Sequence, residues 1–442
     1  MTGARFFSHR ARGRTVRGAA AGLLTAGAFT LAPAASAQDR WAVDTSASAG
    51  VSTNPYLRQG SGSSGTALQG TLDVRPSLVI ERPLTRFELS ADGQITFYNH
   101  DYPTNESFTL SGFGTHQLSQ HTTVHSSVSY LNTITGSVYN SALVPLPVLV
   151  GGTGTAPTTG TTGLDTTAPV VTVPTASLPL YLNDPALGVL GRRQQAFQFG
   201  GGIATTISAR DSISADSSVS FSRFDGIGLG DFNYFTPSVS WQRALSDRTS
   251  LGATFVVGFT DYLRTNVGDA TTYAPQATLS HVLGSGWRLN ASLGVTFANL
   301  HEATGGTRST SSLSGSASVC QQDARRNMCF SASRQVAPSA LQGLRTDTSV
   351  SASLTYLLNE YDSLSGGVSY SHADEPLQRS VVGLRSGSID YVNATGSYSH
   401  RFARALSGFV NAGYAKTFDD RITRGGSFTG QVGISYRFGS QR

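Results

Sequence analysis

Long apolar runs are missing from this sequence. No stretch of eighteen apolar residues occurs in its 442 residues, so no helix of the length that spans a bilayer is predicted. Apolar residues make up 39% of the chain and its mean hydropathy is near zero. Both values are low for a helical membrane protein but typical of a barrel of alternating strands.

An excess of charge of one sign is also missing once the N-terminus is set aside. The chain has 32 basic and 27 acidic residues, and residues 1 to 37 hold five arginines and no acidic residue. Subtracting these five leaves 27 basic residues against 27 acidic ones. Lys416 is the single lysine, and no basic block is interleaved with aromatic residues. Nucleic acid is therefore not an expected partner.

Catalytic and metal-binding motifs are missing too. The nine histidines show no His-Glu-x-x-His spacing, and neither Gly-x-Ser-x-Gly nor Cys-x-x-Cys occurs. The sequence thus predicts no catalytic residue, no metal and no cofactor. Because a barrel fold does not itself exclude catalysis, a barrel enzyme using one of the many serines remains an alternative.

What is present begins with a secretory signal. Its arginines precede a small-residue and apolar run, Gly18 to Ala32, and Ala35-Ser36-Ala37 then forms an A-x-A cleavage site. The run is too short for a comfortable bilayer span. Residues 1–37 are therefore predicted to be a cleaved signal peptide, and residues 38–442 a single membrane domain.

The remaining chain reads as strands with apolar residues at every second position. Eighteen such segments are bounded by turn residues. They are 41–52, 69–80, 85–99, 106–118, 121–132, 192–208, 211–224, 232–243, 248–262, 271–283, 286–300, 310–322, 327–337, 345–358, 361–372, 386–402, 405–418 and 426–438. The pattern predicts an all-β fold, a single transmembrane antiparallel up-and-down barrel of about 18 strands, with 16 or 20 as alternatives. Short connections alternate with longer ones, which indicates periplasmic turns and extracellular loops.

The last strand carries a further signature. Gln431, Gly433, Tyr436 and Phe438 place a polar residue, a glycine and two aromatics at the spacing of an assembly signal. This segment resembles the carboxy-terminal signal of Gram-negative outer-membrane barrels, although four residues follow the final aromatic. The resemblance implies a bacterial outer-membrane location and recognition by the barrel assembly machinery.

Three tryptophans fall at one end of the predicted barrel. Trp41 opens the first strand, Trp241 closes the eighth and Trp287 opens the eleventh. Together with Tyr436 and Phe438 they are predicted to form an aromatic girdle in contact with outer-membrane lipid at the periplasmic interface. Scattered core tryptophans are the alternative.

The two cysteines flank a turn. Centring a hairpin between Ala324 and Arg325 places Cys320 opposite Cys329, which predicts a cross-strand disulfide in a secreted chain. Two inert buried thiols are the alternative.

The inner wall is predicted to be rich in Ser, Thr, Gly, Asn and Gln, with few charges. Strand alternation directs Asp73, Arg75, Glu88 and Asp92 inward across one hairpin. Arg288 and Arg437 are further inward charges near the periplasmic mouth. These charges either neutralise one another or form a strip that selects solutes.

One connection, residues 133–189, is far longer than the others and rich in Gly, Thr, Pro and Val. Its prolines disfavour central strands, whereas its valines and leucines disfavour a disordered loop. It is predicted to fold into the lumen as a constriction or to cap the outer mouth. An exposed flap is the alternative.

The segment Ala42 to Leu57 consists of a Ser/Ala/Gly-rich strand that runs into Asn54-Pro55. With the strands that follow, it resembles the β-barrel porin type 2 family. That resemblance implies the outer-membrane pore of an exopolysaccharide export system, with periplasmic export components as partners. The sequence therefore predicts a channel for hydrophilic solutes, and a plugged structural or surface-interaction barrel as its alternative. The oligomeric state is left open.

Overall fold

A computed structural model describes most of the chain after the predicted signal. The described residues are 38–57, 66–99, 102–134, 192–225, 230–263, 268–284, 286–301, 306–323, 325–339, 343–375, 377, 387–419 and 425–439. The signal prediction (1–37) and nearly all of the predicted long loop (133–189) fall outside them. Thr133 and Ile134, assigned to that loop, belong instead to the end of a strand.

Eighteen β-strands make up the described fold. They are β1 (Gln38–Ser52), β2 (Ala67–Arg82), β3 (Thr85–Tyr98), β4 (Asn105–Gln117), β5 (Thr122–Ile134), β6 (Arg193–Thr206), β7 (Asp211–Phe224), β8 (Phe232–Ser246), β9 (Thr249–Tyr262), β10 (Ala270–Val282), β11 (Trp287–His301), β12 (Thr307–Gln322), β13 (Arg326–Pro338), β14 (Leu344–Leu357), β15 (Asp362–Ala373), β16 (Ile389–Arg401), β17 (Leu406–Asp419) and β18 (Ser427–Gly439). No helix in this part of the chain is long and apolar enough to cross a membrane.

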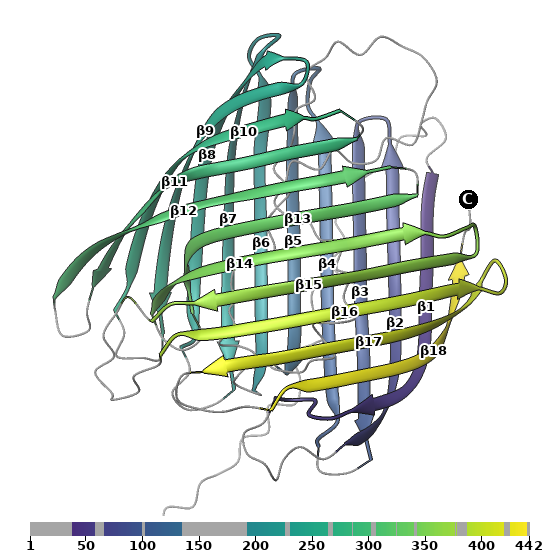
Figure 1. Cartoon of the computed structure of the whole chain (residues 1–442). Helices are drawn as coiled ribbons and strands as arrows, with labels where there is room; N and C mark the ends of the chain where they lie inside the picture. Colours follow the sequence, from purple (N-terminus) through teal and green to yellow (C-terminus); the bar gives the residue numbers. More distant parts are fainter. Residues whose placement is uncertain are drawn as a thin grey trace, which may run out of the picture. The chain divides into compact units, whose positions relative to one another are not determined.

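The sheet closes on itself. Each strand pairs antiparallel with its neighbours in sequence, and β1 pairs with β18 over eleven residue pairs, from Ala42 opposite Gly439 to Ser52 opposite Thr429. Figure 1 shows β1 in purple beside β18 in yellow. Closure leaves no edge strand, so backbone groups find partners around the whole ring. The predicted antiparallel up-and-down barrel of 18 strands is confirmed.

The connections separate the two ends of the barrel. Eight connections of two to four residues join β2 to β3, β4 to β5, and so on to β16 and β17; we call this the short-turn end. It also holds the start of β1 and the finish of β18. The other connections have five or more residues and define the long-loop end. In outer-membrane barrels short turns face the periplasm and long loops face outward. The short-turn end is therefore the predicted periplasmic end, and the long-loop end is the predicted extracellular end.

Side chains alternate strictly along the wall. On β2, Leu68, Leu72 and Val74 are 58%, 53% and 47% exposed, whereas the intervening Thr71 and Asp73 are buried. Every strand except β5 exposes large outward apolar side chains in this way, because their natural neighbour is lipid rather than a protein core. The buried polar residues lie on the opposite face, which lines the lumen.

The ends of β13 and β14 depart from the regular wall. Pairing between β12 and β13 stops at Gly315 and Arg334, although both strands continue. Val336 and Leu344 instead share a buried cluster with Leu300, which faces the lumen from β11. Because β12 lies between β11 and β13 in the sheet, this tip of the hairpin must cross the lumen side of β12. The wall thus contributes its own inward-folded piece near the long-loop end, which the sequence analysis did not predict.

The alternation makes neighbouring positions of one strand respond differently to a charge. Leu293 lies at the middle of β11, faces outward and is 63% exposed, whereas Ser292 faces the lumen. Leu293→Arg should reduce the free energy of unfolding in bilayers by about 2–4 kcal/mol, the cost of an arginine at the membrane midplane. Ser292→Arg, its control, should cost much less because its charge reaches water. Equal losses in denaturant titrations of both variants would contradict the assignment of the two faces.

Candidate functional site: the lumen wall

The strongest charge cluster on the lumen wall joins β2 and β3. The Arg75 guanidinium lies 2.9 Å from the Asp73 carboxylate and 2.8 Å from that of Asp92. Alternation directs all three side chains inward, and the antiparallel register brings Asp92 beside Arg75. One arginine thus bridges two carboxylates that would otherwise repel each other.

Glu88, predicted for the same cluster, takes a different partner. Its carboxylate lies 3.4 Å from Arg86 on its own strand. Arg86 also lies 3.9 Å from Glu81, and Glu81 pairs with Arg40 of β1 at 2.8 Å. These pairs lie closer to the short-turn end, so the predicted group of four belongs to two neighbouring groups.

Arg437 extends this row of charges to the junction between the first and last strands, β1 and β18. Its guanidinium donates two hydrogen bonds to the Asp44 carboxylate, at 2.6 and 2.8 Å, across the β1–β18 junction. A bidentate pair of this kind fixes both orientation and register. We call this continuous row the charged strip; its members are Arg40, Asp44, Asp73, Arg75, Glu81, Arg86, Glu88, Asp92 and Arg437. Four arginines there face five carboxylates, so the strip is almost neutral.

Arg288, the remaining predicted lumen charge, lies outside the charged strip. It faces inward on β11, directly opposite Cys320 of β12. The four strip members that the sequence analysis did not name, Arg40, Asp44, Glu81 and Arg86, share the inward parity of their neighbours. The alternation of the strands could have identified these four residues as lumen-facing, but their contacts with other strands depend on the register between strands.

Hydroxyl pairs occupy much of the remaining lumen wall. Serines meet across neighbouring strands at 2.6 Å for Ser90 and Ser111, and at 2.9 Å for Ser292 and Ser316. Similar pairs join the strands around the ring: Ser214 with Ser240, Ser331 with Ser351, Ser333 with Ser349, and Ser407 with Ser435. These groups satisfy each other while keeping lone pairs for water, so the wall is polar without carrying charge.

A cavity of about 990 Å³ lies against the charged strip. Its lining includes Asp44, Arg75 and Arg437, together with Arg401 at the end of β16 and Arg404 of the β16–β17 turn. The strip therefore borders open space inside the barrel rather than a packed core.

The structure also places the predicted cysteines and the residues of the carboxy-terminal signal. Cys320 and Cys329 lie opposite each other on β12 and β13, with Cα atoms 4.1 Å apart, and are joined by a disulfide. Of the carboxy-terminal signal, Gln431 and Gly433 face inward on β18, whereas Tyr436 and Phe438 face outward with ring centroids 4.5 Å apart. Their recognition by assembly factors stays a prediction.

The three tryptophans lie near the short-turn end. Trp41 and Trp241 project outward with 53% and 40% of their surface exposed, and Trp287 is the first residue of β11. Their proposed role as an interface girdle stays a prediction that this placement suits.

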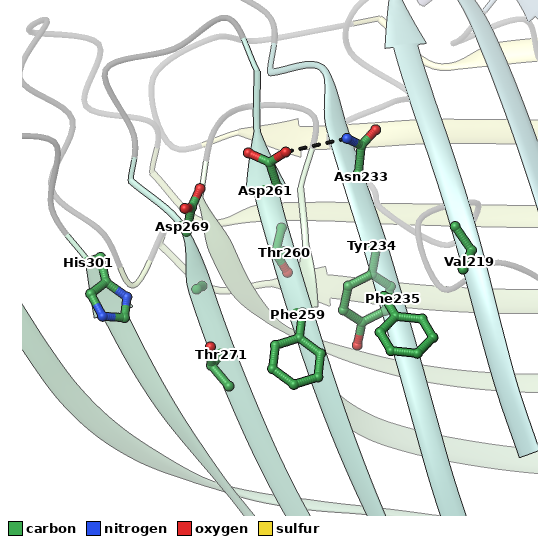
Figure 2. A pocket seen from close by; sticks show the side chains of 11 residues that line it. Val219, Asn233, Tyr234, Phe235, Phe259, Thr260, Asp261, Asp269, Thr271 and His301 are labelled. Atoms are coloured by element: carbon green, nitrogen blue, oxygen red, sulfur yellow. Dashed lines mark hydrogen bonds between the residues drawn. The ribbon is translucent and has the colours of Figure 1, made fainter.

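A shallow groove of about 430 Å³ lies on the outer face, at the long-loop end of β8 to β11. Figure 2 shows the rings of Phe235 and Phe259 below Asp261 and Asp269, and the two rings stack with centroids 6.0 Å apart. Partial burial and the nearby Asp261 carboxylate raise the pKa of Asp269, which precedes β10. The groove opens away from the lumen, so it does not belong to the pore lining.

The composition of the outer face indicates which medium surrounds the barrel. A closed sheet whose outer face exposes large apolar side chains is stable in hydrocarbon, because closure leaves no edge strand. Single-chain barrels with an even number of antiparallel strands are the form found in bacterial outer membranes. The chain is an outer-membrane β-barrel.

Comparison with known proteins gives distant structural similarities. The chain is similar to a BenF-like porin from Pseudomonas fluorescens Pf-5 (11% identity, 91% of this chain and 99% of that chain covered, TM-score 0.42). It is also similar to Pseudomonas aeruginosa OpdL (11%, 91% and 99%, TM-score 0.41) and to the FrpB iron transporter from Neisseria meningitidis (10%, 90% and 82%, TM-score 0.40). No family model and no curated protein matches the chain. Similarities at this level say nothing about what this barrel transports.

Arg75 sets the balance of the charged strip. Arg75→Met removes one positive charge and leaves Asp73 and Asp92 facing each other, so a conducting barrel should shift its preference toward cations. Arg75→Lys keeps the charge and serves as the control. Reversal potentials in a KCl gradient measure the preference. Identical values for Arg75→Met and the parent protein would show that the strip does not act on passing ions.

Proposed function

We propose that this protein is a channel that passes hydrophilic solutes across the outer membrane. The observation that carries the proposal is the polar lumen wall, in which hydroxyl pairs surround the ring and all charges of the strip are paired. An eighteen-stranded barrel encloses more width than its own side chains fill, so water and small solutes have room to pass.

Export of an exopolysaccharide is the more specific form of this proposal. It rests on the resemblance of the first strand to the β-barrel porin type 2 family and agrees with the hydroxyl-rich wall, which can exchange hydrogen bonds with sugar hydroxyls. The inward-facing aromatics lend it little support: Tyr56 is buried, and its ring packs against Tyr98 and Tyr102 rather than forming an open stacking row. Periplasmic export components would be the partners.

A plugged barrel with a structural or surface-interaction role is the second candidate. The inward-folded ends of β13 and β14 favour it, because Leu344 and Arg345 are buried to 1% and 0% exposure near the long-loop end. A segment that packs so tightly on the inner wall narrows the lumen.

Conductance separates these candidates. Residues 38–442, refolded and inserted into a planar bilayer, are expected to give a steady conductance of a water-filled barrel. Heat-modifiable migration on a gel verifies folding in the same sample. Silence from verified folded protein would contradict the open channel and favour the plugged barrel.

Deletion of the gene separates general diffusion from export. Loss of secreted polysaccharide with normal uptake of small solutes is expected for an export pore. Normal secretion with slow uptake of a nutrient would reject export and leave a diffusion channel. Labelling of the folded barrel by a serine-directed active-site probe would instead favour the enzyme alternative.

A further inference from the structure

One histidine differs from the others in the described strands by facing the lumen. His125 is the fourth residue of β5, close to the short-turn end, and is 5% exposed. The remaining described strand histidines project from the outer face: His116, His281, His301, His372 and His400. Four of them contact a Thr or Asp side chain: His116 contacts Thr85, His281 contacts Thr249, His372 contacts Asp390 and His400 contacts Asp362.

His125 reaches over a whole strand to find its partner. It lies opposite Gly202 of β6, and Gly202 lies opposite Asp216 of β7, so the three residues form one row across the wall. The His125 Nε2 atom is 2.8 Å from the Asp216 carboxylate. The contact therefore passes directly above Gly202.

Gly202 makes this contact possible. A Cβ atom at this position would overlap the Asp216 carboxylate and lie 2.8 Å from Cε1 of His125. Any other residue would push the two partners apart. Gly201, the preceding residue, faces outward, and a Cβ there would meet the backbone oxygen of His125 at 3.2 Å, a much milder contact.

Asp216 is held from its other side by hydroxyls. Its second carboxylate oxygen accepts a hydrogen bond from Ser214 at 3.0 Å, and Ser214 pairs with Ser240 of β8 at 2.7 Å. Ser214 and Ser240 thus keep the carboxylate in position whatever the state of the imidazole. The other ring nitrogen of His125, Nδ1, has no hydrogen-bond partner among the described residues, so it can gain or lose a proton.

The charge of this pair depends on that proton. With neutral His125 the pair carries one negative charge from Asp216, and with protonated His125 it carries none. Along the lumen faces of β4 to β8, Asp216 is the one acidic side chain in the described chain, and His125 the one basic side chain. The turns beneath hold His121, Arg210, Asp247 and Arg248, all exposed at the rim. In contrast to the charged strip, this part of the wall has no arginine to offset the carboxylate.

We propose that His125 and Asp216 form a proton-binding selectivity site on the lumen wall, separate from the charged strip. Small inorganic ions are the solutes it acts on. At high pH the uncompensated carboxylate attracts cations into the short-turn mouth, and protonation of His125 removes that attraction. The inference rests on the proposed channel function, because selectivity has a meaning only for a conducting lumen.

Reversal potentials test the site directly. Residues 38–442 in a planar bilayer with a KCl gradient are measured between pH 5.5 and 8.5, where imidazoles ordinarily titrate. The cation preference of the parent protein should rise with pH by about two-fold, the Boltzmann effect of one unit charge about 10 Å away in water. His125→Gln should remove most of this dependence, and Asp216→Asn should remove it with a lower cation preference at pH 8.5.

Two matched controls accompany these variants. His281→Gln changes a histidine at the same end of the barrel that faces outward, and it should leave the pH dependence as in the parent. Gly202→Ala should weaken the dependence by separating the pair, whereas Gly201→Ala should preserve it. A pH dependence that persists unchanged in His125→Gln would overturn the proposal.

A second measurement does not need conduction. The imidazole carbon and proton signals of His125, assigned by their loss in His125→Gln, are followed by NMR across the same pH range in detergent. Asp216→Asn should change the chemical shifts of these signals, because it removes the carboxylate that lies 2.8 Å from Nε2. Unchanged signals would reject the pair even in a conducting barrel. A silent barrel in which the signals do change would reject the channel and its selectivity, but not the pair.

Discussion

Backbone hydrogen bonding in a medium without water is the constraint on which this structure depends. Within hydrocarbon an unpaired N–H or C=O group costs several kcal/mol, so a sheet is stable there only if it has no edge. The pairing of β1 with β18 removes the edges, and the Asp44–Arg437 ion pair lies on the lumen side of that junction. The seam therefore joins the two ends of the chain by both backbone and side-chain contacts.

Once the ring is closed, a two-residue period sorts every side chain. Large apolar groups such as Leu293 and Phe255 face lipid, and small polar groups face the lumen. On the lumen wall, Arg75 lies between the carboxylates of Asp73 and Asp92, and His125 lies in one row with Asp216 across the bare backbone of Gly202. The ladder of the sheet thus decides which charges on different strands meet, because residues directly opposite each other on adjacent strands have Cβ atoms about 5 Å apart.

The inner wall is not uniform around the ring. One side, from β18 to β3, holds the charged strip, in which arginines and carboxylates nearly cancel. The side from β5 to β8 holds hydroxyl pairs and a single ion pair whose charge follows pH. The folded tip of β13 and β14 adds a packed apolar cluster against β10 and β11. A solute in the lumen would therefore meet different chemistry on different sides.

The sequence by itself determined the strands, their faces and their number, because alternation is a local property that each segment carries independently of its neighbours. It also directed Asp73, Arg75, Asp92 and Arg437 inward. Register and long-range packing were decided by the tertiary structure alone. Only the register brings Asp92, and not Glu88, beside Arg75, and only the bare backbone at Gly202 lets His125 reach Asp216 across β6. Alternation places side chains on faces, but partners between strands depend on how the whole ring is staggered and closed.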